Sequence, residues 1–324
     1  MLPLYSASAN HGSHCKMRLT RACRGHSVAT ERARPAGRRR TRRMDPKAGS
    51  FGCNTYSYMR REPADACLAR LADLGFETFE VMIHPGHLWH SEPATVRDLG
   101  RLLASRRLGL VTLNMPNIDI NIAAAAPEMR EHSLRMLERA VGLAGDLGAS
   151  GLVIAPGKAN PLFPPPPQEL AAHFFAALDR LVPKAEAAGT ALWVENMPFA
   201  FLPEIETLAA AVDTYGCDAV GIVYDVANAH FIGEPVFDGL LRARDRLKLV
   251  HLSDTGTDVY RHAPVGSGTV PFGAVPAALA AAGYAARPVL EIVSADPDRE
   301  IVESAARLAA IGLGAGGSVQ ARPS

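Results

Sequence analysis

The stretch from Gly221 to Glu234, GIVYDVANAHFIGE, contains the pattern from which the fold can be predicted. An apolar run ends abruptly in Asp225, and Asn228 and His230 follow before a Gly-Glu-Pro break. The run is typical of a buried strand, whereas the aspartate that closes it is either the N-cap of a helix or a ligand in a site. The rest of the chain is needed to decide between the two.

The same pattern occurs eight times from Phe51 onward: a short apolar or β-branched run, a polar residue, a loop and a segment with helical spacing. The eight runs are FGCNTYSY, TFEVMI, LVTLNMP, SGLVIAPG, ALWVEN, VGIVYD, LKLVHLSD and RPVLEIV. Alternating strands and helices indicate right-handed crossovers and a parallel sheet. Eight units within residues 51–314 match the roughly 250 residues of a closed (β/α)8 TIM barrel. An open doubly wound sheet is the alternative, although its Gly-rich phosphate turn after the first strand is missing.

Composition indicates a globular α/β protein. The chain has 324 residues, of which 48% are hydrophobic and 21% charged, enough to bury a sizeable core in one domain. No apolar run approaches the length of a spanning helix, so we expect no membrane partner. The five cysteines are scattered without a CxxC pair, as expected for reduced thiols in the cytoplasm.

The two ends of the chain differ from its body. Residues 1–43 hold eleven of the 34 Lys and Arg and one of the 33 acids, which leaves 23 basic and 32 acidic residues. We expect residues 1–50 to be a disordered Arg-rich leader. Three interpretations remain open: a translation start mistakenly assigned upstream of Met44, an organelle presequence, or a basic arm for anionic partners. The Gly- and Ser-rich residues 315–324 predict a flexible tail. The acidic body is poorly suited to nucleic acid, because such binding neutralises phosphates.

The residues that close the later strands are informative, because the carboxyl ends of barrel strands carry the active site. Three carboxylates and an imidazole close them: Glu195, Asp225, His251 and Glu291. Taken alone, each has a purely structural interpretation. Asp225 could cap a helix and Glu195 could accept from a backbone amide, while His251 could be a core histidine and Glu291 the partner of an arginine. Together they would repel one another unless a cation lay between them. The oxygen-rich set favours one Mn²⁺, Mg²⁺ or Co²⁺ ion over Zn²⁺.

Several segments, in this order, resemble the xylose isomerase-like TIM barrel superfamily: WVEN, VYDVANAH, HLSD, RHAPVGSGTVPF and VLEI. That superfamily includes sugar phosphate isomerases and epimerases, ketose 3-epimerases, inosose-processing enzymes and AP endonuclease family 2-like proteins. The resemblance extends from about Phe51 to Gly314. It implies that the same four residues hold one divalent metal. It also implies that Glu195 and Glu291 are catalytic and exchange protons with the carbon beside a carbonyl, through an enediolate.

The resemblance to the AP endonucleases is incomplete. In that branch a histidine precedes the Pro-Gly after strand four, a histidine follows the strand-six aspartate by three residues, and an aspartate lies two residues before the histidine of RHAPVGSG. This chain has Ala155, Asn228 and Tyr260 at those positions. The loss of three zinc ligands argues against phosphodiester cleavage and favours His262 as a substrate contact.

The leading hypothesis is a metal-dependent isomerase or epimerase of a small polyhydroxy carbonyl compound: a sugar, a sugar phosphate or a keto-inositol. The alternatives are a dehydratase of inosose or dehydroshikimate type, an AP endonuclease and a non-catalytic sugar-binding barrel. The candidate substrate-binding residues are His262, Arg261, Asn228, Asn114, Lys158 and His84. The four prolines at 164–167 predict an extended segment and a possible homo-oligomer contact.

Overall fold

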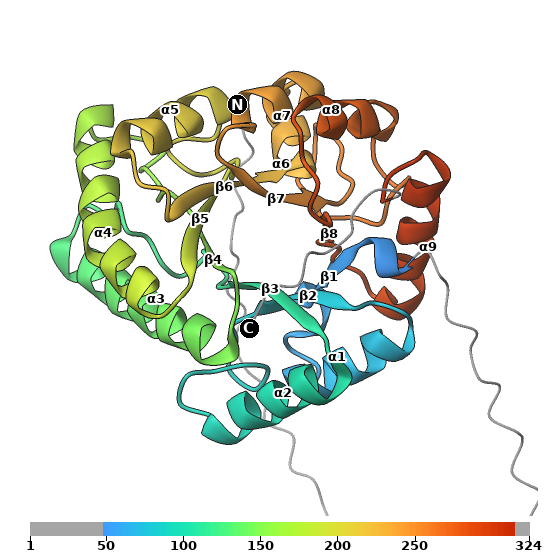
Figure 1. The fold of residues 1–324 in the computed structure, drawn as a ribbon. Helices are drawn as coiled ribbons and strands as arrows, with labels where there is room; N and C mark the ends of the chain where they lie inside the picture. Colours follow the sequence, from blue (N-terminus) through green and yellow to red (C-terminus); the bar gives the residue numbers. More distant parts are fainter. Residues whose placement is uncertain (1–47, 315–324) are drawn as a thin grey trace, which may run out of the picture. The chain divides into compact units, whose positions relative to one another are not determined.

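A computed structural model describes residues 48–314 of the chain, and most of the predicted leader and the whole predicted tail lie outside them. Eight parallel strands pair in sequence order and close into a barrel, with β1 pairing β8 (Figure 1). The predicted (β/α)8 TIM barrel is therefore confirmed, and the open doubly wound sheet is wrong. The described fold begins at a short 3₁₀ helix, η1 (Ala48–Ser50), three residues before the predicted boundary.

All eight predicted strands are present. Their bounds are β1 (Gly52–Asn54), β2 (Thr78–Met82), β3 (Gly109–Asn114), β4 (Gly151–Ile154), β5 (Ala191–Glu195), β6 (Val220–Asp225), β7 (Leu247–Leu252) and β8 (Val289–Leu290). The helices are α1 (Ala64–Asp73), α2 (Pro93–Arg106), α3 (Pro127–Leu147), α4 (Pro167–Ala187), α5 (Ile205–Tyr215), α6 (Val226–Phe231), α7 (Val236–Ala243), α8 (Val275–Ala281) and α9 (Pro297–Ala310). Two further 3₁₀ helices are η2 (Tyr56–Tyr58) and η3 (Phe272–Ala274).

The helices surround the barrel, and their apolar faces form the main core with the outward-facing strand residues (Figure 1). On α1, for example, the fully buried Leu68 and Leu71 lie one turn apart and face the barrel. Within residues 48–314, no helix combines the length and the apolar character that crossing a membrane would require.

The barrel interior is layered, and the layering places the candidate site. Since residues i and i+2 of a strand point to the same side, each strand sends alternate side chains inward. One apolar cluster inside the barrel consists of Val153, Trp193, Val223, Leu249 and Val289. Two residues after the cluster members of β5, β6, β7 and β8 come Glu195, Asp225, His251 and Glu291, of which Glu291 directly follows the end of β8. The apolar cluster thus lies one layer below the four predicted ligands.

A glycine makes room for the largest side chain of that apolar cluster. A Cβ atom added to Gly151 on β4 would lie 2.6 Å from Cδ2 of Trp193 on the neighbouring strand β5. Contacts that short do not occur between real Cβ atoms and their neighbours, so residue 151 must lack a side chain if Trp193 is to fill the barrel.

The proline-rich segment differs in part from the prediction. Pro164, Pro165 and Pro166 are non-helical as expected, but Pro167 is the first residue of α4. Proline suits this position because the N–H group at a helix start has no partner within the helix. Just before it, Leu162 and Phe163 are 92% and 86% exposed. A homo-oligomer contact at this loop stays a prediction.

Candidate metal centre

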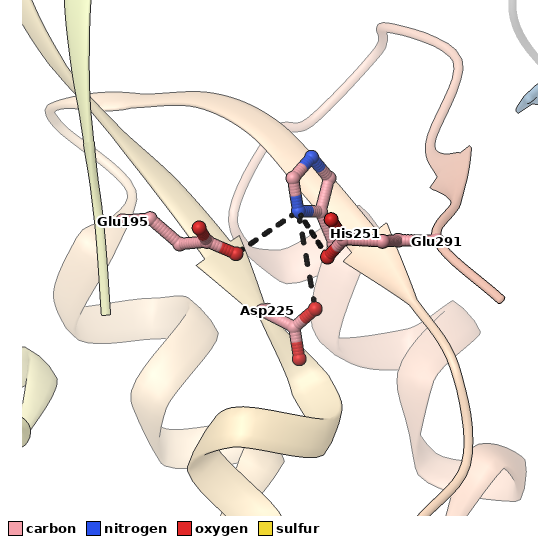
Figure 2. A group of neighbouring side chains, drawn as sticks. All are labelled: Glu195, Asp225, His251 and Glu291. Atoms are coloured by element: carbon pink, nitrogen blue, oxygen red, sulfur yellow. Dashed lines mark hydrogen bonds and ion pairs between the residues drawn. The ribbon is translucent and has the colours of Figure 1, made fainter. Parts of the chain in front are cut away.

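The four predicted ligands meet at the carboxyl ends of the strands. Figure 2 shows the Glu195 and Glu291 carboxylates approaching from opposite sides, with the His251 ring and Asp225 between them. His251 Nδ1 lies 3.1 Å from Glu195 Oε1, 3.2 Å from Glu291 Oε2 and 3.9 Å from Asp225 Oδ2. Two ligands that each lie about 2.1 Å from one ion are about 3 to 4.2 Å apart. The spacing around His251 Nδ1 therefore fits a single bound ion.

Asp225 acts as a helix cap and also presents a free oxygen to this centre. Its Oδ1 accepts the backbone N–H of Asn228 at 2.7 Å, which caps the first turn of α6. Its Oδ2 is buried and has no hydrogen-bond partner. A buried carboxylate oxygen without a partner is costly unless a cation or a donor satisfies it. The cap and ligand interpretations are therefore compatible, because each oxygen can serve one of them.

Asn196 fixes the backbone of Asp225 from the neighbouring strand. Its Oδ1 accepts the Asp225 N–H at 2.7 Å, and its Nδ2 donates to the Asp225 carbonyl at 3.2 Å. Both bonds continue the pairing of β5 and β6 beyond the end of β5. Sequence reasoning missed this role, although Asn196 directly follows Glu195 in the WVEN segment.

Glu80 on β2 orients the His251 ring, and sequence reasoning missed it as well. His251 Nε2 lies 3.1 Å from Glu80 Oε2, so the ring presents Nδ1 to the centre. Glu80 is fully buried and also accepts from Thr112 Oγ1 at 2.5 Å and from Asn114 Nδ2 at 3.0 Å. Burial opposes its ionisation, but the interactions with His251, Thr112 and Asn114 outweigh burial and lower the pKa of Glu80.

Replacing Glu80 by Gln tests this orienting role. Carboxylates that hold a metal-ligating histidine typically change metal affinity about 10- to 100-fold when replaced. We expect the dissociation constant for Mn²⁺, measured by calorimetry, to rise within that range. Glu77→Gln is the matched control, because Glu77 pairs with Arg287 at the surface and should leave Mn²⁺ binding unchanged. Equal Mn²⁺ affinity in wild type and Glu80→Gln would contradict the role.

The electrostatics of the cluster favour a bound cation. Burial raises the pKa of Glu195, and His251 offsets only part of that effect. Burial also raises the pKa of Asp225; nearby His262 opposes this and Glu291 adds to it. Burial alone would lower the pKa of His251, but Glu80 and Glu291 raise it well above its usual value. The carboxylates therefore draw positive charge to this position, and a divalent ion would supply it.

A cavity of about 850 Å³ opens onto the centre. Glu195 and Glu291 line it, and each is 4% exposed. Asp225 and His251 do not line the cavity, and each is 0% exposed. A ligand in the cavity can therefore touch the two glutamates, whereas the aspartate and the histidine are in a position to hold an ion only.

Tyr260, Asn228 and His262 form a hydrogen-bonded network beside the cluster. The Tyr260 hydroxyl donates to Asn228 Oδ1 and lies against His262 Nε2, both at 2.7 Å. His262 Nδ1 lies 3.1 Å from Ser253 Oγ and 3.3 Å from Glu291 Oε2. Within residues 48–314, Glu195, Asp225, His251 and Glu291 form the one group of side chains arranged to hold an ion. Asn228 and Tyr260, at two positions where the AP endonuclease branch has zinc ligands, thus contribute an amide and a phenol instead.

Five of the six predicted substrate contacts line the cavity: His262, Arg261, Asn228, Asn114 and Lys158. Lys158 is partly occupied, because its Nζ donates to the carbonyls of Asn117 and Ile118 at 2.6 and 2.9 Å. The sixth, His84, is not among the lining residues. Its backbone bridges to Leu88 and closes a turn, and its Nδ1 lies 2.8 Å from the Pro85 carbonyl.

Fold and site together define a class: a closed (β/α)8 barrel with a candidate divalent-metal centre at the carboxyl ends of its strands. Residues 68–311 match the family model described as xylose isomerase-like TIM barrel, and the chain belongs to this family.

Three similar proteins illustrate the range of the family. A probable endonuclease 4 of Mycobacterium ulcerans is 26% identical over 221 residues, which are 64% of this chain and 82% of that protein. The structure of a D-tagatose 3-epimerase-like protein has a TM-score of 0.72 and 21% identity, and the match covers 81% of this chain and 96% of that one. The structure of IOLI with a zinc atom has a TM-score of 0.70 and 17% identity, covering 83% and 99%.

Proposed function

We propose that the protein is a divalent-metal-dependent isomerase or epimerase of a polyhydroxy carbonyl compound. The observation that carries this proposal is that two of the four cluster residues line the cavity and the other two do not. The Glu195 and Glu291 carboxylates face each other across the cluster (Figure 2). Both line the cavity, whereas Asp225 and His251 do not and are 0% exposed. Two opposed carboxylates are what proton transfer on the two faces of one carbon requires.

The side chains fit a divalent ion. Glu195, Asp225, His251 and Glu291 would hold it, and the unpartnered Asp225 Oδ2 would gain its missing partner. Three carboxylates with one imidazole favour Mn²⁺, Mg²⁺ or Co²⁺. Once bound, the ion would polarise the substrate carbonyl and the adjacent hydroxyl and so acidify the C–H bond of the carbon that bears that hydroxyl.

The two glutamates would carry the proton. One carboxylate takes the proton from the carbon beside the carbonyl, and the C–H electron pair moves into the C=C bond of the enediolate. The carbonyl π pair moves onto the carbonyl oxygen in the same step. The other glutamate, which carries a proton taken from solvent, then gives that proton to the opposite face as the C=C pair forms the new C–H bond and the carbonyl is restored, which inverts that carbon without loss of any group. A dehydratase would instead expel water from the neighbouring carbon, and no feature of this cavity favours that outcome.

The polar groups around the floor of the cavity suit substrate hydroxyls. His262 and Asn228 are held by Tyr260, so they are fixed before a ligand arrives. Asn114 is held in the same way by Glu80. Arg261 is exposed at the rim, where its guanidinium can reach a ligand. Similarity to a D-tagatose 3-epimerase-like structure supports the choice of an epimerase, while similarity to an endonuclease supports the family alone.

Solvent-deuterium incorporation tests the proposal. The full-length protein, loaded with Mn²⁺, is incubated in D₂O with a panel of ketoses, keto-inositols and sugar phosphates, and products are followed by NMR. We expect one deuterium at the carbon beside the carbonyl of at least one compound, an epimer or isomer as product, and loss of both after chelation. Release of water would establish a lyase instead. No exchange in any compound by a protein with bound metal would contradict the proposal.

A further inference from the structure

The cavity is larger than a single sugar ring needs. Its volume of about 850 Å³ lies in the upper part of the range, about 300 to 1,000 Å³, that holds drug-sized ligands. We call the part of its lining formed by Glu195, Glu291 and His262 the floor. Apolar side chains from the loops after β3, β5, β7 and β8 line the wall above: Pro116, Ile118, Met197, Phe199, Pro264 and Val293. We call these six residues the apolar wall.

Three of the six residues of the apolar wall are large apolar side chains that are left exposed. Ile118 is 79% exposed, Phe199 60% and Val293 45%. Three large apolar side chains left uncovered around one cavity, on three separate loops, indicate a surface that a ligand covers. The cavity walls are therefore complementary to an apolar group attached to the part of the ligand that reaches the floor.

Phe199 is anchored to the polar floor through other rings. Its ring meets Tyr260 edge-on at 5.3 Å between centroids, and Phe231 lies 6.1 Å from Phe199 and 5.3 Å from Tyr260. The Tyr260 hydroxyl in turn contacts Asn228 and His262. Phe199 is thus held on one side and open on the other, which is the arrangement of a stacking platform for an aromatic group.

The six residues of the apolar wall offer a phosphate no cation. Among the described residues that line the cavity, Lys158 and Arg261 are the two with Lys or Arg side chains. The Lys158 ammonium is already engaged by two backbone carbonyls, which hold the loop that carries Ile118. An apolar extension of the ligand therefore fits the wall better than an anionic one.

We propose that the substrate is a polyhydroxy ketone joined to an aromatic group, such as an aryl glycoside whose sugar ring carries a free ketone. This inference rests on the proposed function, because the ketone and its neighbouring C–H must reach Glu195 and Glu291. An aglycone blocks the anomeric carbon, so the reacting carbonyl has to be a ring ketone. The aryl group then lies against Phe199 and Ile118.

The test compares the binding of phenyl β-D-glucoside and methyl β-D-glucoside to the full-length Mn²⁺-loaded protein by calorimetry. We expect the phenyl compound to bind at least about tenfold more tightly, as expected for the burial of one aromatic ring. Phe199→Ala and Ile118→Ala should each reduce that preference to about threefold or less. Phe163→Ala is the matched control, because Phe163 is 86% exposed but does not line the cavity, and it should leave the preference unchanged.

Equal or undetectable binding of the two glucosides by the wild type would overturn the inference, as would a preference that survives both wall substitutions. If Phe199→Ala changed the oligomeric state in sedimentation and not the preference, a second copy of the chain would be the occupant of the wall and the inference would be wrong. The proposed function fails in a separate experiment, if no ketone exchanges deuterium with the solvent. The two failures are distinguishable because binding of these glucosides requires no turnover.

Discussion

Replacing Asp225 by Asn is expected to remove tight metal binding while leaving the fold intact. The amide oxygen of Asn can still accept the Asn228 N–H at the start of α6, so the helix cap is retained. The negative oxygen that faces the centre is lost. We expect Mn²⁺ affinity to fall more than about 100-fold, beyond the effect of a residue that only orients a ligand.

Thermal unfolding with and without Mn²⁺ measures the change and separates it from simple destabilisation. At a Mn²⁺ concentration of 100 times its dissociation constant, wild type should gain about 2.7 kcal/mol of stability, and Asp225→Asn almost none. In the presence of a chelator the variant should be as stable as wild type or more stable, because a buried carboxylate oxygen without a hydrogen-bond partner has been removed.

Asp254→Asn is the matched control for this comparison. Asp254 is also buried, and its carboxylate accepts the backbone N–H groups of Thr255, Gly266 and Val270. It does not belong to the four-residue cluster. Its replacement should destabilise the protein equally with and without Mn²⁺ and preserve the gain from the metal. A full Mn²⁺-dependent gain in Asp225→Asn would show that Asp225 is only a cap.

Replacing Glu291 by Gln is expected to reduce product formation about 10²- to 10⁴-fold at saturating Mn²⁺, the range usual for loss of a general acid or base. Glu195→Gln should behave similarly, since each carboxylate serves one face of the reacting carbon. Because the other glutamate remains, either variant can still exchange the C–H proton of its substrate or product with deuterium from the solvent while forming little epimer. Such exchange without epimerisation, followed by NMR in D₂O, would identify two separate bases.

Glu300→Gln provides the control at the same cavity. Glu300 lines the rim, where it contacts Ser294 and Arg299, but it does not belong to the four-residue cluster. Its replacement should change product formation less than about threefold. If Glu291→Gln and Glu195→Gln lost no more activity than Glu300→Gln, the assignment of the two glutamates as proton carriers would be wrong.

The sequence was sufficient to predict the barrel and to name four residues whose side chains meet at the carboxyl ends of its strands. Each of the last four strands has an inward-facing apolar residue followed two positions later by a polar one, as in Trp193 and Glu195 or Leu249 and His251. That spacing directs both side chains inward, so polar residues that close consecutive strands converge once the strand count is known. The local sequence around Asp225 could not decide between cap and ligand, because its two oxygens face different partners.

Other features could not be read from the sequence because they depend on contacts between distant strands. Glu80 lies within an apolar run, and the histidine it orients is 171 residues away. Lys158 was predicted to bind substrate, yet its ammonium also supports the loop of Asn117 and Ile118, which no local pattern reveals. The wall around Phe199 is assembled from loops after four strands, and single exposed apolar residues are common in any protein.

The central claim is that one divalent ion binds between Glu195, Asp225, His251 and Glu291. The most direct measurement is an anomalous difference map from a crystal of the protein grown with Mn²⁺. We predict one strong peak about 2.0 to 2.3 Å from a carboxylate oxygen of each acid and from His251 Nδ1. A map without a peak at this position, or with His251 turned so that Nδ1 faces away, would contradict the account.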